Sequence, residues 1–361
     1  MKTLLYNCIA CAFLLPLIVL GNNDHKGKHT KEKTITKEFS VNADALLKVT
    51  NSYGAVEMTA WDKNTVAIEV VIKTNGNSES KVAERLEQID VTFSNTAAMV
   101  TAVTDFSKNQ ERSWRKWNKR NSVNVTVNYT IKFPKGNELN ISNDYGEIFL
   151  DTAENNVTLN CDHGKMKIGK LLGKDNSLNF DHTDNVAIAY INGGRINADY
   201  SSFKIEEAEN IRLNADHTKS HFGTISYLNY NCDYNTLQID LAYNVTGMGD
   251  YLSLRLGGIS GNLDLKADYG SIKIAHMTDD AGSIRIASEL AGIKIGYDPN
   301  YHFSFELNLD YTSIKGEEGF TTNTKQVESQ ESYYEGYYGD KFSGNKVSID
   351  SEYGSIRFEK Q

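Results

Sequence analysis

Apolar and polar residues alternate with period two over most of the chain, and the alternation returns in a repeated phrase. In each copy Asp follows a small or apolar residue, Tyr or His follows the Asp, and another alternating apolar stretch comes next. Eight copies from Tyr145 to Tyr269 cover 124 residues in seven steps, a mean of 17.7 (124/7). A period of this length predicts a solenoid, in which each repeat is one turn of chain stacked on the next.

The alternation assigns the side chains to two faces, because successive residues of a strand point in opposite directions. Leu159, Cys161 and His163 are predicted to face the core together with an apolar pair later in the repeat, such as Met166 and Ile168. Each coil is expected to supply two short strands and a third, weaker one, stacked at about 4.8 Å. The predicted fold is all-β, a single-stranded parallel β-helix of about 18 residues per coil.

An N-terminal region, residues 34–140, breaks the period and contains one outlying copy of the phrase, Asn51-Ser-Tyr53-Gly. Long alternating stretches predict strands over 65–73, 99–106 and 123–133. Apolar residues on one side of residues 80–89 predict one short helix. Because an uncapped coil exposes bare strand edges, this region is interpreted as a β cap on the solenoid.

The remaining boundaries follow from composition. Lys2, an apolar run over 9–20 and the small residues Val19 and Gly21 predict a signal peptide, residues 1–21, and hence export to the periplasm, the cell surface or the medium. A polar linker is expected over 22–33, and β-helix repeats over 141–361 with a polar, tyrosine-rich loop excursion at 317–345. No later stretch is apolar enough to span a bilayer as a helix, so no transmembrane span is expected in the mature chain.

The net charge of the chain bears on the kind of partner it can bind. With 38 basic and 47 acidic residues the formal net charge is -9, which argues against nucleic acid as a partner.

Cys161 and Cys232 occupy the same position four coils apart. At about 4.8 Å per coil they lie roughly 19 Å apart, beyond the ~7 Å limit for a disulfide. Two buried free thiols are therefore predicted.

Two columns of side chains recur at the coil spacing. The Asp column suits either divalent cations or hydrogen bonds to its own turn, and the second interpretation is favoured. The Tyr/His column suits either a metal row or a stacked aromatic ladder. Because Tyr and His alternate freely, we predict the ladder, with no metal and no cofactor. Its members are Tyr145, His163, His182, Tyr200, His217, Tyr234, Tyr251, Tyr269, Tyr311 and Tyr353.

A basic loop over residues 107–122 departs from the acidic character of the chain and contains two of the three tryptophans. Such a mixture suits an envelope glycan, an acidic protein or an anionic membrane surface. The alternative is a solvated hairpin whose tryptophans fold back on the cap. The candidate binding residues are Arg112, Trp114, Arg115, Lys116, Trp117 and Arg120.

Candidate catalytic residues are few. Some β-helix proteins cleave polysaccharides with paired carboxylates, and Asp279-Asp280, near His276 and Arg285, is the only such pair in a predicted turn. A solvated turn is the favoured explanation of this pair. No Gly-x-Ser-x-Gly or His-Glu-x-x-His motif occurs, and no enzyme is predicted.

The phrases Asn51-Ser-Tyr-Gly-Ala-Val-Glu-Met, Asn143-Asp-Tyr-Gly-Glu-Ile, Asp268-Tyr-Gly-Ser-Ile-Lys-Ile and Glu352-Tyr-Gly-Ser-Ile-Arg-Phe resemble the bacterial "putative adhesin" families of β-strand repeats. The resemblance implies a right-handed β-helix in an uncharacterised envelope protein and carries no catalytic residue. The function predicted is a non-enzymatic adhesin or scaffold that presents a binding surface. The alternatives are a structural solenoid that polymerises end to end and a polysaccharide-cleaving enzyme.

Overall fold

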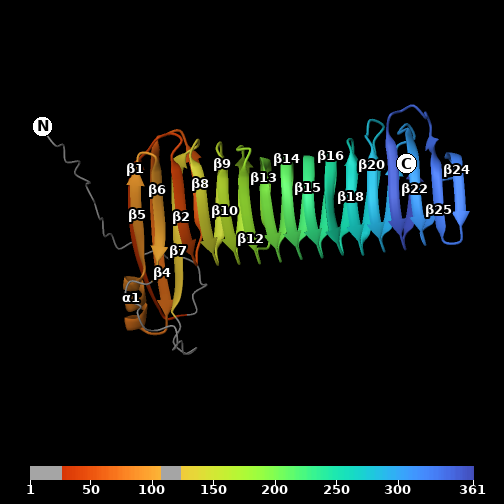
Figure 1. The fold of residues 1–361 in the computed structure, drawn as a ribbon. Helices are drawn as coiled ribbons and strands as arrows, with labels where there is room; N and C mark the ends of the chain where they lie inside the picture. Colours follow the sequence, from red (N-terminus) through yellow and green to blue (C-terminus); the bar gives the residue numbers. More distant parts are fainter. Residues whose placement is uncertain (1–26, 107–122) are drawn as a thin grey trace.

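The computed structural model describes residues 27–106 and 123–361, which form an all-β molecule with one large mixed sheet and one short helix (Figure 1). The N-terminal elements are β1 (His29–Ser40), β2 (Leu46–Ser52), β3 (Val56–Trp61), β4 (Thr65–Gly76), α1 (Glu79–Gln88), β5 (Asp90–Thr96), β6 (Met99–Asp105) and β7 (Asn124–Pro134). The strands predicted over 65–73, 99–106 and 123–133 correspond to β4, β6 and β7, and the helix predicted over 80–89 to α1.

The remaining strands form a long row of parallel elements that ends in an antiparallel hairpin (Figure 1). They are β8 (Glu138–Asp144), β9 (Glu147–Ala153), β10 (Val157–Asp162), β11 (Lys165–Leu171), β12 (Asn176–Asp181), β13 (Val186–Asp199), β14 (Ser202–Asp216), β15 (Lys219–Asp233), β16 (Thr236–Asp250), β17 (Ser253–Ile259), β18 (Leu263–Asp268), β19 (Ser271–Met277), β20 (Ile284–Glu289), β21 (Gly292–Tyr297), β22 (Phe303–Asp310), β23 (Ser313–Lys315), β24 (Thr321–Glu328), β25 (Glu331–Tyr338), β26 (Lys346–Glu352) and β27 (Ser355–Lys360).

Two parallel ladders run along this row. We call the two strands that flank one Tyr/His turn a rung. Strands before the turn pair with one another in a first ladder, as β8, β10 and β12 do, and strands after the turn pair in a second ladder, as β9, β11 and β13 do. In β13–β16 a single long strand supplies both ladders. The described rungs have two strands each, so the predicted third strand is wrong; short corners join the ladders instead.

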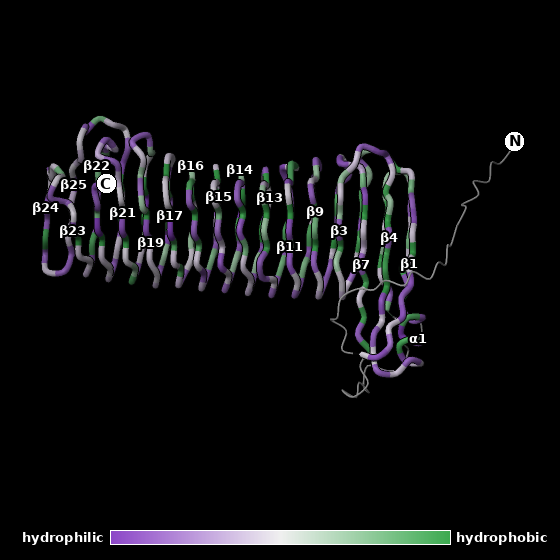
Figure 2. Tube along the Cα trace, turned by 180° about the vertical axis from the view of Figure 1, so that it is seen from behind, coloured by the Kyte–Doolittle hydropathy of each residue, from purple (hydrophilic) through white to green (hydrophobic). Residues whose placement is uncertain are grey.

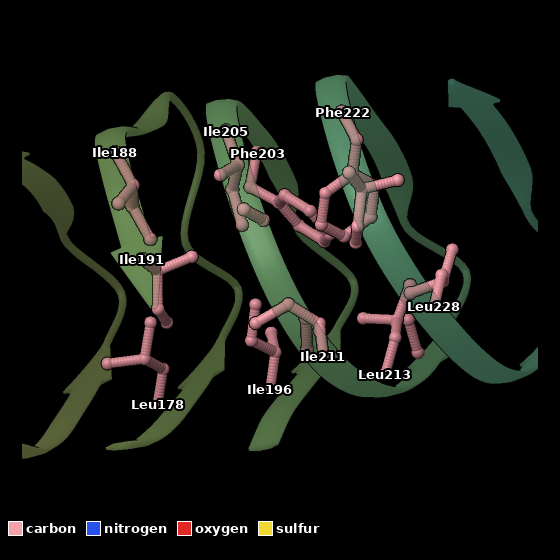
Figure 3. Packing of buried hydrophobic residues seen from close by; sticks show 14 of the residues in the cluster. Leu178, Ile188, Ile191, Ile196, Phe203, Ile205, Ile211, Leu213, Phe222 and Leu228 are labelled. Atoms are coloured by element: carbon pink, nitrogen blue, oxygen red, sulfur yellow. The ribbon is translucent and has the colours of Figure 1, made fainter. Parts of the chain in front are cut away.

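The core lies between the two ladders. Figure 3 shows Ile188, Ile205 and Phe222 from the second ladder on one side and Leu178, Ile196 and Leu213 from the first ladder on the other, with their side chains directed inward. All of these side chains are buried. Because alternate residues of each strand face outward, hydrophobic and hydrophilic segments alternate along the trace (Figure 2). Burial of the inward face of the strands in both ladders stabilises the row.

At the N-terminal end, the outlying copy of the phrase belongs to the row. β2 pairs in parallel with β8, with Asn51 opposite Asn143, and β3 pairs with β9. Residues between β3 and β8 are therefore an insertion that covers this end, with β6 beside β2 and β7 beside β3. β1 pairs antiparallel with β4 and begins at His29, so the last residues of the linker predicted over 22–33 lie in a strand. The signal peptide predicted over 1–21 lies outside the described residues.

At the C-terminal end, the order in space differs from the order in sequence. β26 lies between β20 and β22, and β27 between β21 and β23, so the final rung is inserted between two earlier ones. The chain end accordingly lies inside the blue region of Figure 1, with β24 and β25 beyond it. The loop excursion predicted at 317–345 is wrong in part, since it contains β24 and β25, an antiparallel hairpin paired with β22. The threonines of β24 and the tyrosines of β25 favour strands, which explains why this polar segment forms them.

Candidate functional site: the outward-facing columns

The residue after each Asp adopts a left-handed backbone conformation. The Tyr and His residues of the column have φ between 46° and 64°, and Leu290 takes the same place in its rung with φ of 53°. This conformation costs a non-glycine residue roughly 1–2 kcal/mol. Each turn N–H donates to the carbonyl of the next rung, as from Tyr200 to Asp216 at 3.0 Å. The turn thereby reverses the chain without interrupting the hydrogen-bond ladder.

The rings of this column stack face to face along the row. Eight successive contacts join nine rings, from Tyr53 to Tyr269, with centroid distances of 4.7–5.4 Å and interplanar angles of 1–24°. Tyr311 and Tyr353 form a separate pair at 4.8 Å, and Leu290 lies between the two stacks. Phe106 packs edge-on against Tyr53 at 5.6 Å and ends the stack. The rings predicted as a ladder are stacked as the repeat indicated.

Two features of the column differ from the sequence interpretation. His163 was assigned to the core face, but the column is outward and its tyrosines are 47–56% exposed. The positive φ breaks the period-two alternation at that residue, so the alternation of the preceding strand does not predict which way the turn side chain points. The sequence interpretation missed Tyr53 because the insertion separates it from the repeats, and it missed Phe106 because this residue lies within the insertion.

Asn and Asp form further outward columns. The side-chain amides of Asn179, Asn197 and Asn214 each donate to the amide oxygen of the Asn in the preceding rung over 2.7–3.0 Å, and Asn160 accepts at the start of this column. The Asp carboxylates accept the backbone N–H of the next Asp, as in Asp233 to Asp216 at 3.2 Å and Asp250 to Asp233 at 2.8 Å. The expectation that each Asp side chain bonds its own turn is therefore wrong here, because these carboxylates accept from the adjacent rung. The turn is bonded instead by Thr or Ser hydroxyls, such as that of Thr183, which donates to the Asp181 carbonyl.

The Asp column brings carboxylates close together. Burial raises the pKa of Asp144, and the neighbouring charge of Asp162 raises it further. His163 lowers this pKa and partly offsets the two effects. Within residues 27–106 and 123–361, no group of three or more His, Cys, Asp or Glu side chains is arranged to hold a metal ion. Several of these carboxylates accept backbone N–H groups along the row, whereas that of Asp181 lies 2.8 Å from His182 Nδ1.

Cys161 and Cys232 are buried and free, as the coil register predicted. Burial raises the pKa of the Cys161 thiol to about 11 and that of Cys232 to about 12. Since the thiolate is the reactive form, both sulfurs are packing groups.

The other predicted residues divide in two groups. Asp280 accepts a hydrogen bond from the Thr278 hydroxyl within its own turn, and His276 lies 4.0 Å from Asp298. The Asp279-Asp280 pair is thus held as a turn and is not directed at His276. The basic loop residues Arg112, Trp114, Arg115, Lys116, Trp117 and Arg120 lie outside the described residues. Among the described helices none is long and apolar enough to cross a membrane.

No family model matches the sequence, and no curated protein does. Solved structures of bacterial "putative adhesins" are similar to this chain. One from Parabacteroides distasonis shares 8% identity at a TM-score of 0.32, over 91% of this chain and 97% of that one. One from Parabacteroides merdae shares 12% identity at 0.30, over 90% and 96%. A "putative lipid binding protein" from P. distasonis shares 12% at 0.31, over 90% and 96%. The adhesin name is the one that the sequence resemblance predicted.

Proposed function

We propose that this chain is an exported, non-enzymatic adhesin or scaffold of the cell envelope, built as a right-handed parallel β-helix that presents its outer columns to a partner. The observation that carries the proposal is the stacked ring column, which repeats one exposed group at the rung spacing over nine rings. Such a regular exposed surface suits a repetitive or extended partner. Continuous parallel pairing of the two ladders supports the coiled path.

Capped ends favour this function over end-to-end polymerisation. The first ladder ends in the antiparallel strands β5 and β24, and the second ladder ends in β1 and in β23, which has three residues. Covered, short or charged edges are the devices that keep sheets from adding further strands. Residues 107–122 remain a second proposed contact segment, through Arg112, Trp114, Arg115, Lys116, Trp117 and Arg120.

Binding of the mature protein to intact bacterial or host cells tests the proposal. The fluorescently labelled protein is expected to bind in a saturable way and to leave polysaccharides intact. Absence of binding to every cell surface tried, or release of glycan fragments measured by chromatography, would contradict it.

A further inference from the structure

A groove on the outer surface lies at the corner between the two ladders in β12–β16. Its volume is about 670 Å³, within the range of ligand sites. Its lining includes three cations, Lys174, Arg195 and Arg212, one acid, Asp175, and the side chains of Asn210, Tyr227 and Asn229. We propose that this groove binds a carboxylated oligosaccharide, which deepens the proposed function by naming its ligand class.

The hollow has a local cause in the sequence. On successive rungs one corner position is occupied by Gly193, Asn210, Tyr227 and Asn244. Gly193 and Gly194 carry no side chain, so the corner of β13 is bare. Gly194 has φ of 142°, and a Cβ there would collide with the carbonyl of Asn176. The glycine pair is therefore required by the backbone and leaves space beside the Asn210 and Tyr227 side chains.

Opposed cations line the groove. Arg195 and Arg212 are exposed register partners on adjacent strands, and no ion pair involves either of them or Lys174 within the described chain. Like charges directly opposite one another destabilise a sheet. Some cations of the row pair with an acid of an adjacent rung, such as Lys165 with Glu147 at 3.4 Å and Lys346 with Glu306 at 2.6 Å. Arg255 and Lys273 are another pair of opposed cations, outside the groove. In a chain of net charge -9, two unpaired guanidiniums side by side favour an anionic ligand.

The groups around these cations favour a sugar. Guanidinium groups bind carboxylates through two parallel hydrogen bonds. The Tyr227 ring is 47% exposed and is held edge-on by Tyr243 at 5.7 Å, so one ring face is available to the apolar face of a pyranose. The exposed amides of Asn210 and Asn229 can both donate to and accept from hydroxyls. Cations, a positioned ring and amides within one groove match a chain of uronic acids.

The test is binding of a fluorescently labelled hexamer of galacturonic acid to the mature protein, followed by anisotropy at low ionic strength. Saturable binding is expected, at least tenfold tighter than that of maltohexaose, and weakened by added salt. Replacing both Arg195 and Arg212 by Ser should weaken binding at least tenfold. Tyr227→Ala should weaken it several-fold, whereas Tyr227→Phe should retain it.

The matched control is Arg285→Ser. Arg285 is exposed and occupies the same column as Arg195 and Arg212, but it lies opposite Asp264 and outside the groove. Its replacement should change the dissociation constant by less than twofold. Because the Arg195–Arg212 pair is repulsive, the double variant should melt at the same or a higher temperature than the parent, which separates lost binding from lost folding.

The outcomes discriminate between the alternatives. No saturable binding of the hexamer, or equal loss with Arg285→Ser, overturns the proposal. A glutamate hexapeptide that binds as tightly as the hexamer, with an affinity that Tyr227→Ala does not change, would indicate an acidic peptide as the ligand. That result also overturns the proposal. If the groove variants still bind cells, the groove proposal fails while the adhesin function stands; cleavage of the bound hexamer would instead refute the non-enzymatic function.

Discussion

The Tyr and His residues of the turns combine a backbone cost with a side-chain gain. Each adopts positive φ, and each ring stacks on its neighbours. Ring pairs contribute about 0.5–1.5 kcal/mol beyond burial, which is comparable with the cost of about 1–2 kcal/mol for the left-handed conformation. Stacking therefore explains why aromatic residues rather than glycines occupy these turns.

Variants of Tyr200 test this balance, because its ring stacks on His182 at 5.1 Å and on His217 at 4.8 Å. Tyr200→Ala loses both contacts and keeps the backbone cost, so it should destabilise the fold by about 1–3 kcal/mol in urea unfolding. Tyr200→Gly should lose clearly less, since glycine adopts positive φ without cost. Tyr200→Phe is the control and should be nearly neutral. Equal losses for Ala and Gly would contradict the account.

Asp144 gives a pH-dependent prediction, because its pKa is raised above the ordinary value by burial and by Asp162. The folded protein therefore keeps this proton to a higher pH than the unfolded chain does. The contribution of Asp144 to the free energy of unfolding falls as the pH rises from the ordinary Asp pKa, about 4, through the raised pKa, and it is constant above that pH. Asp144→Asn removes this loss.

Urea unfolding at two pH values measures the effect. Asp144→Asn should be more stable than the parent at pH 7 and should lose that advantage at pH 3. The exposed Asp264→Asn is the control and should show no such difference between the two pH values. The prediction is refuted if the difference in stability between Asp144→Asn and the parent favours the variant more at pH 3 than at pH 7.

Among the elements, β26 and β27 have a special role, since they pair on both sides with strands that precede them in the chain. The buried side chains of Ile349 and Ile356 complete the core there. Until these strands are in place, β22 and β23 have no parallel neighbour among the earlier rungs. The end of the row therefore forms only when the whole chain is present.

Removing residues 345–361 tests the consequence. Limited proteolysis followed by mass spectrometry should show rapid cleavage over residues 298–344, while residues 141–297 stay resistant because β20 and β21 keep their pairing with β18 and β19. Removal of Gln361 alone is the control; it loses one backbone bond, to Tyr297, and should leave the pattern unchanged. Full resistance of the truncated chain would show that the inserted rung is dispensable.

The whole molecule is a row of rungs that ends in antiparallel strands at three of its four ladder ends and in the three-residue parallel strand β23 at the fourth (Figure 1). We expect the intact mature protein to sediment as a monomer across a concentration series. Replacing residues 318–343, which contain the β24–β25 hairpin, by a flexible linker uncovers the edge of β22 and should cause concentration-dependent association. Association of the intact protein, or a monomeric variant, would contradict this role of the hairpin.

Much of the architecture is readable locally. The period-two pattern predicted the strands, and the returning Asp-Tyr and Asp-His pairs predicted a stacked ring column. The recurrence of small residues at the Cys161 and Cys232 position predicted free thiols. These features depend on contacts between equivalent residues of neighbouring rungs, so the repeat itself carries the information.

Only the tertiary structure decided the order of the rungs and the position of the groove. The copies at Tyr53 and Tyr353 resemble every other copy, and a parallel ladder accepts any of them as a neighbour, so the sequence alone determined that these rungs exist and not where they lie. The groove depends on Gly194 and Arg195 of one rung lying opposite Ile211 and Arg212 of the next. A site formed between rungs appears only when the stacking brings them together.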